Sequence, residues 1–338
     1  MKILSWQQIS DEQWDAFCDA SPETWGRHRS MSRHGMLADP NNSDHSFGIM
    51  QNGVLMAIAP LILRAIPDTH EREFAYSRNM ATPAPALAQG LFLEKHEELL
   101  QECMRETDQR AIRLDAVRAR IFIDPLTRPM QVEISTQNPL AQFGYTDAST
   151  IAYVIDLSKN EQELLVRMSK GHRSDITFAQ KKDYTVEFFD CTNITEDVWR
   201  VFIDLYHAAA GRIVNSPEQW AETFNRLCGG FASLALARGE DGGPYLSGVL
   251  ISTYKRRAYY SMAATNPQYR SLRGVGAFLQ WHIIGELKRR GFEYYDMGWY
   301  DGTQRIEMSK KEIDIMNFKR HFGGDPVPLW AGIKEYKS

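Results

Sequence analysis

The spacing of apolar residues predicts alternating strands and helices along the first half of the chain. Ser10 and Gln13 have the spacing of a capping box, which begins a helix. The apolar runs 46–50 and 54–63 flank Asn52-Gly53, a pair typical of a two-residue hairpin turn. The later elements expected in this half are a strand at 74–78, a loop rich in Pro and Ala, a helix near 94–107 and a strand at 111–117.

The second half shows a similar order of elements, although the residues themselves do not repeat. Ser158 with Glu161, and Ser216 with Gln219, mark two expected helix starts. The expected strands are 151–157, 185–190, 232–238, 245–254, 258–265, 293–299 and 327–333, and one long helix is expected at 274–291. This order predicts two mixed α/β domains, residues 1–150 and 151–338, each a mostly antiparallel sheet flanked by helices.

A lysine interrupts the apolar side of the last expected helix. On a helical wheel, Ile315, Phe318, Lys319 and Phe322 fall on one side of this helix. Taken alone, the pattern is satisfied by a lysine stem that covers apolar surface while its ammonium group reaches water.

The charge balance excludes a general attraction to polyanions. The chain carries 39 Lys and Arg against 43 Asp and Glu, a formal net charge of −4. A site for nucleic acid or phosphate must therefore be a local basic patch. One such patch is expected in the stretch 167–182, which contains Arg173. It would dock a phosphate-rich partner or be an ordinary solvated helix surface.

The four cysteines and the apolar runs narrow the class of protein further. Cys18, Cys103, Cys191 and Cys228 form no C-x-x-C pair, which argues against a zinc or iron–sulfur site or a disulfide framework. The longest apolar run, residues 54–63, is too short to span a bilayer. We therefore expect a cytoplasmic protein with reduced thiols, without a metal and without stable membrane insertion.

The segment before the long helix at 274–291 has the chemistry of a phosphate seat. Exposed N–H groups at a helix start favour anions, glycines allow close backbone approach, and arginines add charge. The donor-binding residues expected here are Arg270, Arg273, Gly274, Val275 and Gly276. A glycine turn with solvated arginines is the ordinary alternative.

The antiparallel meander, the R-G-V-G turn and the strand and helix that follow resemble the GNAT acyl-CoA N-acyltransferases. Ser271 stands where that family usually carries a basic residue. The strand EYYDMGW, a polar loop and then NFKRHFGG resemble the Fem family of aminoacyl-tRNA-dependent peptidyltransferases, which have two GNAT-like domains. The resemblance implies tandem GNAT-like domains, with the first supporting the fold and acceptor binding and the second catalytic.

The resemblance to the Fem family also implies site residues. It assigns Lys319 to stabilising the negative oxygen formed when an amine attacks the acyl carbon, with Phe318 beside the donor. Asp296 would take the proton of the amine or hold a donor hydroxyl, or be a buried structural carboxylate. The residues expected to contact the acceptor are Arg173, Arg212, Tyr259, Tyr260 and Trp299.

These features predict a transferase without a tightly bound cofactor that acts by direct attack in a ternary complex. The leading hypothesis is transfer of an aminoacyl group from charged tRNA to an amine of a nucleotide-linked or lipid-linked cell-envelope precursor, such as a peptidoglycan or polysaccharide precursor, or to an amino sugar. The alternative donor is acyl-CoA or an acyl carrier protein. A third hypothesis is a non-catalytic binding protein on the same scaffold.

Overall fold

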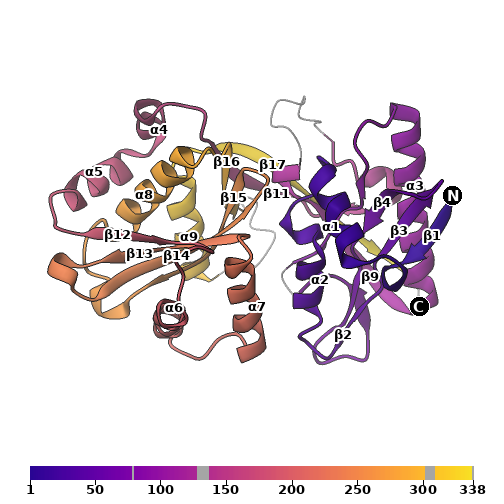
Figure 1. The fold of residues 1–338 in the computed structure, drawn as a ribbon, viewed down its shortest axis with the longest axis horizontal. Helices are drawn as coiled ribbons and strands as arrows, with labels where there is room; N and C mark the ends of the chain where they lie inside the picture. The colour runs from indigo at the N-terminus through magenta and orange to yellow at the C-terminus, as the bar shows by residue number, and fades with distance from the viewer. Residues whose placement is uncertain (78–79, 128–136, 301–308, 337–338) are drawn as a thin grey trace. The chain divides into compact units, whose positions relative to one another are not determined.

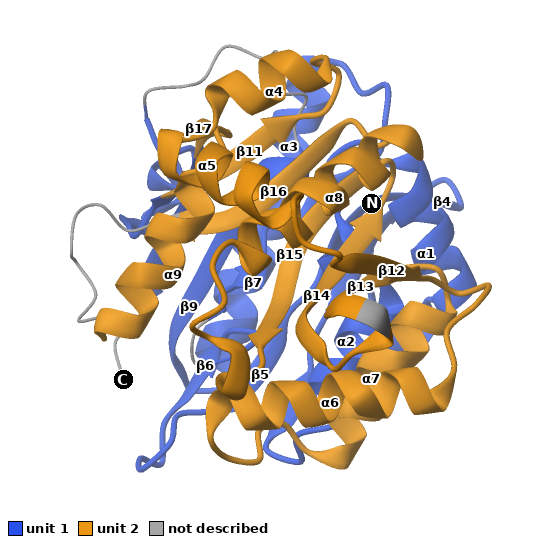
Figure 2. Cartoon of the chain, turned by 90° about the vertical axis from the view of Figure 1, so that its left-hand side faces the viewer, with its two compact units in different colours: residues 1–150, 328–338 blue, residues 151–327 orange. Residues whose placement is uncertain are grey.

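The computed structural model describes residues 1–77, 80–127, 137–300 and 309–336 (Figure 1). It divides into two compact units, coloured separately in Figure 2. Unit 1 contains Met1–Thr150 and Pro328–Ser338, and unit 2 contains Ile151–Val327. Most of the polar loop expected after the strand EYYDMGW, residues 301–308, lies outside the described residues.

Unit 1 contains a four-stranded sheet built around the expected hairpin. Its strands, in spatial order, are β1 (Lys2–Ser5), β3 (Phe47–Gln51), β4 (Val54–Ala59) and β8 (Ala86–Leu87). Asn52 and Gly53 both have positive φ, 51° and 81°, and Gln51 pairs with Val54. The hairpin prediction is therefore confirmed, and its turn has the φ signs of the type that suits twisted strands.

The remaining strands of unit 1 form a second group that ends with the last strand of the chain. They are β2 (Asn42–Asp44), β5 (Ile62–Ala65), β6 (Arg72–Phe74), β7 (Thr82–Pro83), β9 (Ala116–Ile123), β10 (Thr146–Asp147) and β17 (Asp325–Glu335). β17 runs antiparallel to β9, with Trp330 opposite Ile123 and Glu335 opposite Arg118. This pairing is why residues 328–338 complete unit 1, where the sequence had placed them in the second domain.

Three helices accompany these strands: α1 (Asp11–Ala20), α2 (Ser30–Met36) and α3 (Leu93–Arg113). Ser10 and Gln13 form the expected capping box of α1. The prediction of a strand at 111–117 is wrong, because α3 continues to Arg113 and β9 begins only at Ala116. Ala111 is buried in the same core as Leu99 and Met104, so the helical apolar stripe extends to it.

Unit 2 has one six-stranded sheet. Its strands, in spatial order, are β12 (Thr185–Phe189), β13 (Ala232–Arg238), β14 (Tyr245–Tyr254), β15 (Arg257–Thr265), β16 (Tyr294–Tyr300) and β11 (Thr150–Asp156). Neighbouring strands are antiparallel except β15 and β16, which are parallel. With the helices, this confirms the predicted fold class of mostly antiparallel sheets flanked by helices.

Helices cover both faces of this sheet, as Figure 1 shows. Along β13, Ala235 and Ala237 pack toward α8, whereas Leu234 and Leu236 pack toward α6 and α7. The helices of unit 2 are α4 (Glu161–Arg167), α5 (Lys170–Ala179), α6 (Glu196–Ala210), α7 (Pro217–Cys228), α8 (Val275–Arg289) and α9 (Lys310–Arg320). The cap of α4 is Asn160 with Glu163, two residues later than predicted, because its side chain accepts from Glu163 N.

The sheet of unit 2 opens between β15 and β16. These strands pair only from Arg257 to Tyr259, opposite Tyr294 to Asp296, although both continue beyond this point. The register of β15 against β14 shifts between Tyr260 and Met262, which makes Ser261 the extra residue of a β-bulge. Bulges bend a strand and redirect its side chains, and they are frequent beside active sites. The bulge marks the place where a site is expected.

Among the residues that the structure describes, no helix is both long enough and apolar enough to cross a bilayer.

Candidate active site

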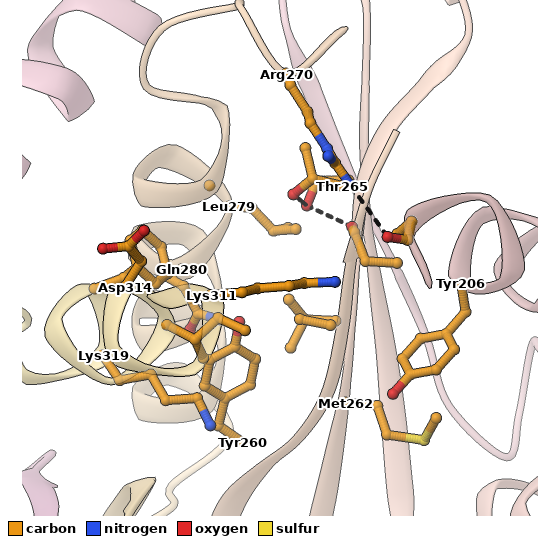
Figure 3. A pocket seen from close by; sticks show the side chains of 18 of the residues that line it. Tyr206, Tyr260, Met262, Thr265, Arg270, Leu279, Gln280, Lys311, Asp314 and Lys319 are labelled. Atoms are coloured by element: carbon orange, nitrogen blue, oxygen red, sulfur yellow. Dashed lines mark hydrogen bonds between the residues drawn. The ribbon is translucent and has the colours of Figure 1, made fainter. Parts of the chain in front are cut away.

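A cleft with a volume of about 770 Å³ lies where β15 diverges from β16. One wall is β15 from Tyr260 to Thr265, and further sides come from α8 and α9 (Figure 3). The lining residues also include Tyr206 and Ala209 from α6 and Ser247 and Val249 from β14. Every lining residue belongs to unit 2. The parallel pairing that stops at Tyr259 leaves room for this cleft.

The Lys319 ammonium group lies in this cleft. Its Nζ is 4.4 Å from the centre of the Tyr260 ring, a cation–π distance. Removal from water lowers the pKa of Lys319 to about 8, and the negative charge of Asp296 opposes the decrease. At neutral pH the group is still mainly charged. It is therefore a cation in a dry site, where it interacts strongly with any negative charge that forms nearby.

Gly298 makes room for the lysine. A Cβ added at Gly298 would lie 3.0 Å from Lys319 Nζ, and the residue has a φ of +95°. Few side chains tolerate that conformation, so glycine is required on both counts. Asp296 Oδ1 accepts a hydrogen bond of 2.7 Å from Gly298 N.

Asp296 is 3 % exposed and is not among the residues that line the cleft. Its carboxylate fixes the turn at Gly298 and supports the charge of Lys319. The geometry therefore gives Asp296 a positioning role, whereas the sequence had suggested a proton acceptor in the cleft.

Phe318 and His172 hold the end of α9 that carries Lys319. The His172 Nε2 donates to the Phe318 carbonyl at 3.0 Å, and the ring centres of the two residues are 5.0 Å apart. Burial lowers the pKa of His172, although the bond to the Phe318 carbonyl opposes this. A Cβ added at Gly276 would lie 3.3 Å from the Phe318 ring. Phe318 therefore lines the cleft and also packs against the first turn of α8.

Gly274 and Val275 are packing residues in this fold. Val275 is buried in the core between the sheet and α8. Gly274 has a φ of +83°, and an added Cβ would lie 2.5 Å from the Asp175 carbonyl oxygen. Glycine at this position therefore lets α5 approach the start of α8. Of the predicted R-G-V-G turn, only Gly276 lines the cleft.

Gly274→Ala is expected to destabilise the protein by about 2–4 kcal/mol, because the Cβ meets backbone and the positive φ is strained. Thermal unfolding measures this. Gly285→Ala is the matched control, since an added Cβ there meets nothing within 4 Å. The control is expected to gain up to about 1 kcal/mol. Equal stabilities of the two variants would contradict the packing role of Gly274.

One end of the cleft is cationic. Arg270 lines it and donates from Nη2 to the Ala209 carbonyl at 3.1 Å. Lys310 and Lys311 line the cleft from the first turn of α9, and Figure 3 shows the Lys311 side chain reaching into it. Asp314 is the acidic residue of the lining. This end is suited to an anionic group of a donor or acceptor.

Arg273 and Arg173 lie in a different place, a second groove of about 410 Å³ that we call the basic groove. It is lined by Lys170, Arg173, Ser174, Thr177, Phe178, Lys181 and Arg273. Arg273 Nε donates to Asp175 Oδ1 at 2.8 Å, and Arg173 Nη1 donates to the Met168 carbonyl at 2.7 Å. Phe178 is 38 % exposed, and the Arg273 guanidinium lies 5.1 Å from its ring centre.

The predicted acceptor residues are not all brought together. Tyr260 lines the cleft, and the Tyr259 hydroxyl lies 3.9 Å from the position of a Cβ added at Gly298. Trp299, 41 % exposed, and Arg212, exposed after α6, are not among the cleft residues. The alternation of side chains along a strand explains Trp299, which cannot share a face with its neighbour Gly298.

Sequence reasoning missed Gln280, Tyr206, Lys310, Lys311 and Asp314 as lining residues. Gln280 had a detectable signal, because it is an amide within the otherwise apolar stretch GAFLQW. The two lysines of α9 look like ordinary solvated residues in the sequence.

Within residues 1–77, 80–127, 137–300 and 309–336, the structure has no cluster of three or more His, Cys, Asp or Glu side chains suited to a metal ion.

A family model described as an acetyltransferase (GNAT) domain matches residues 171–312, which lie within unit 2. No curated protein sequence matches the chain.

Solved structures share the fold over nearly the whole chain. FemX is 15 % identical, with a TM-score of 0.71, and the match covers 99 % of this chain and 98 % of that one. L-PGS from Bacillus licheniformis is 12 % identical, with a TM-score of 0.60 and coverages of 97 % and 93 %. A tandem GNAT protein from the clavulanic acid biosynthesis pathway is 12 % identical, with a TM-score of 0.54 and coverages of 100 % and 99 %.

At these identities the likeness shows the fold, and the matched domain adds the class of chemistry. The predicted resemblance to FemX-like proteins of the GNAT fold is therefore confirmed. The chain is an acyltransferase with tandem domains of the GNAT fold, and it resembles the Fem family.

Proposed function

We propose that this acyltransferase moves an aminoacyl group from the ester of a charged tRNA to an amine. The observation that carries the proposal is the Lys319 ammonium, held over the Tyr260 ring in a cleft that opens where β15 and β16 part. A fixed charge in a site of low dielectric stabilises an oxyanion more than it stabilises a neutral carbonyl.

In the proposed reaction, the amine nitrogen attacks the carbonyl carbon, and the carbonyl oxygen becomes negative beside Lys319. The new C–N bond forms and the C–O bond of the ester breaks. The amine loses one proton and the leaving hydroxyl gains one, so the balance needs no metal or redox partner. Lys319, with a pKa of about 8, can pass a proton to the leaving oxygen near neutral pH.

Two features support tRNA as the donor. Gly274 is used to pack against α5, and the Phe318 ring covers Gly276, so the turn offers little open backbone for the pyrophosphate of coenzyme A. The basic groove lies on the other side of the same turn, with four cations and the exposed Phe178. Cations that bind phosphates beside an aromatic ring that stacks on a base are typical of sites for single-stranded nucleic acid.

A thioester donor remains the second candidate. Arg270, Lys311 and Gly276 line one end of the cleft, and they would also suit the phosphates of coenzyme A. For the acceptor, we propose an amine of a cell-envelope precursor, because FemX and L-PGS share the fold. Under this proposal unit 1 supports the fold and binds the acceptor.

Binding measurements separate the two donors. Total tRNA charged with a mixture of radiolabelled amino acids is expected to bind with a strong salt dependence. Replacing Lys170 and Lys181 by Met should reduce the slope of log K against log salt by roughly 1 for each phosphate that the variant no longer binds. Micromolar binding of coenzyme A that is abolished in Gly276→Glu, without binding of tRNA, would overturn the ester donor in favour of the thioester.

The rate should depend on the charge of Lys319. We expect kcat to decrease as the pH rises above about 8, where Lys319 loses its proton. Lys319→Arg should keep part of the activity and should lose this decrease, because arginine stays charged. A pH–rate profile of both proteins measures the effect. A wild-type rate that rises through pH 8 and levels off would instead identify neutral Lys319 as a base.

A further inference from the structure

An unpaired amide group is buried in the wall of the cleft. Gln280 lies on α8 and is 1 % exposed, and it lines the cleft beside Leu279. Among the residues that the structure describes, its Nε2 has no hydrogen-bond acceptor. Leaving a buried donor unpaired costs about 1–3 kcal/mol, so such groups are rare without a ligand or water.

The orientation of this amide is set by a buried tyrosine. The Tyr295 hydroxyl donates to Gln280 Oε1 at 3.0 Å, and Tyr295 is fully buried. This bond occupies the oxygen and directs the two N–H bonds of Nε2 elsewhere. The Gln280 amide lies close enough to the Tyr260 phenol to oppose the rise in its pKa that burial causes. Gln280 and Lys319 therefore both face Tyr260, at the phenol and the ring.

The lining of the cleft near Gln280 contains donors and apolar surface. Lys319 is a cation, Tyr260 has a buried hydroxyl, and Leu279 and Phe318 are apolar. Figure 3 shows Gln280, Tyr260 and Lys319 gathered on the side of the cleft formed by α8 and α9. A ligand that satisfies these groups must present a hydrogen-bond acceptor inside an apolar environment, which describes the carbonyl of an acyl group.

We propose that Gln280 Nε2 donates a hydrogen bond to the carbonyl oxygen of the acyl group bound in the cleft, next to Lys319. The inference rests on the proposed function and adds a second donor for the reacting group. No proton is transferred by Gln280, because a neutral amide only donates the bond. Its contribution increases as the oxygen becomes negative, since hydrogen bonds to charged acceptors are stronger.

The test compares two RNA hairpins that end in CCA. One carries an aminoacyl group through a stable amide at its 3′ end, and the other carries none. We expect the wild-type protein to prefer the aminoacyl hairpin, and Gln280→Met to lose about three- to tenfold of that preference. Gln280→Glu keeps the shape of the side chain but presents oxygens to the carbonyl, so it should lose at least as much. Aminoacyl transfer by Gln280→Met should also show a lower kcat.

His282→Asn is the matched control, because His282 lies on the same helix but lines another groove. It should keep the wild-type preference, and melting curves of all variants report folding. If Gln280→Met folds and keeps the full preference, this inference is overturned while the donor proposal stands. If neither hairpin binds the wild-type protein at low salt, the aminoacyl-tRNA donor is overturned, and this inference with it.

Discussion

Lys319→Met is expected to lower kcat by about 10²–10³-fold, the loss found when a single oxyanion donor is removed. The side chain lies in a cleft at 4.4 Å from the Tyr260 ring centre, and methionine keeps its length while removing the charge. Aminoacyl transfer under saturating donor measures the effect. Lys95→Met, at a surface ion pair of α3, is the control and should keep the wild-type rate.

The same substitution should stabilise the fold. Burial lowers the pKa of Lys319 from 10.5 to about 8, so between these values the unfolded chain holds a proton that the folded chain has released. Stability therefore rises with pH across this window, and the full cost of the charge applies below pH 8. Methionine removes a cost of up to roughly 3 kcal/mol at pH 7. A variant that is inactive and less stable would argue for a structural lysine.

Gly298→Ala is expected to lower kcat by about 10–100-fold through displacement of Lys319. The new Cβ would lie 3.0 Å from Lys319 Nζ, and alanine at a φ of +95° strains the strand. A shift of the ammonium by several tenths of an ångström weakens its contact with a developing oxyanion. Steady-state kinetics with the folded variant measure the loss.

Gly274→Ala provides the comparison for this prediction, because its added Cβ meets the Asp175 backbone rather than Lys319. It should lose stability, while the molecules that remain folded keep the wild-type kcat. Gly298→Ala should show the opposite balance, with a small loss of stability and a large loss of rate. If the two variants have the same ratio of rate loss to stability loss, Gly298 has no special relation to the site.

The fold was predictable where local signals and packing agree. The Asn52-Gly53 turn and the Ser10 and Ser216 caps appear in the structure as expected, because each depends on only a few neighbouring residues. The strand predicted at 111–117 failed because β-branched and apolar residues at a helix end cannot be distinguished locally from a strand start. The pairing of β17 with β9 joins residues about 200 positions apart and had no local signal.

The site was predictable only in part, for similar reasons. Lys319 was marked by its apolar neighbours, and the bulged strand brings Tyr260 to it. Gly274 and Gly276 look equivalent in the sequence, yet one packs against α5 and the other faces Phe318. Arg273 lies three residues after Arg270 but turns toward α5, because Asp175 holds its guanidinium. These distinctions depend on which neighbouring helix lies opposite each residue.

The place of β17 in unit 1 has a consequence for synthesis. β9 lacks its antiparallel partner until Trp330 to Glu335 have left the ribosome, since those residues supply the adjacent strand. The first 150 residues therefore wait, with an open sheet edge, while unit 2 is translated. Although domains usually fold in the order of their synthesis, here the unit that is made first closes last, and an N-terminal fragment expressed alone would expose the edge of β9.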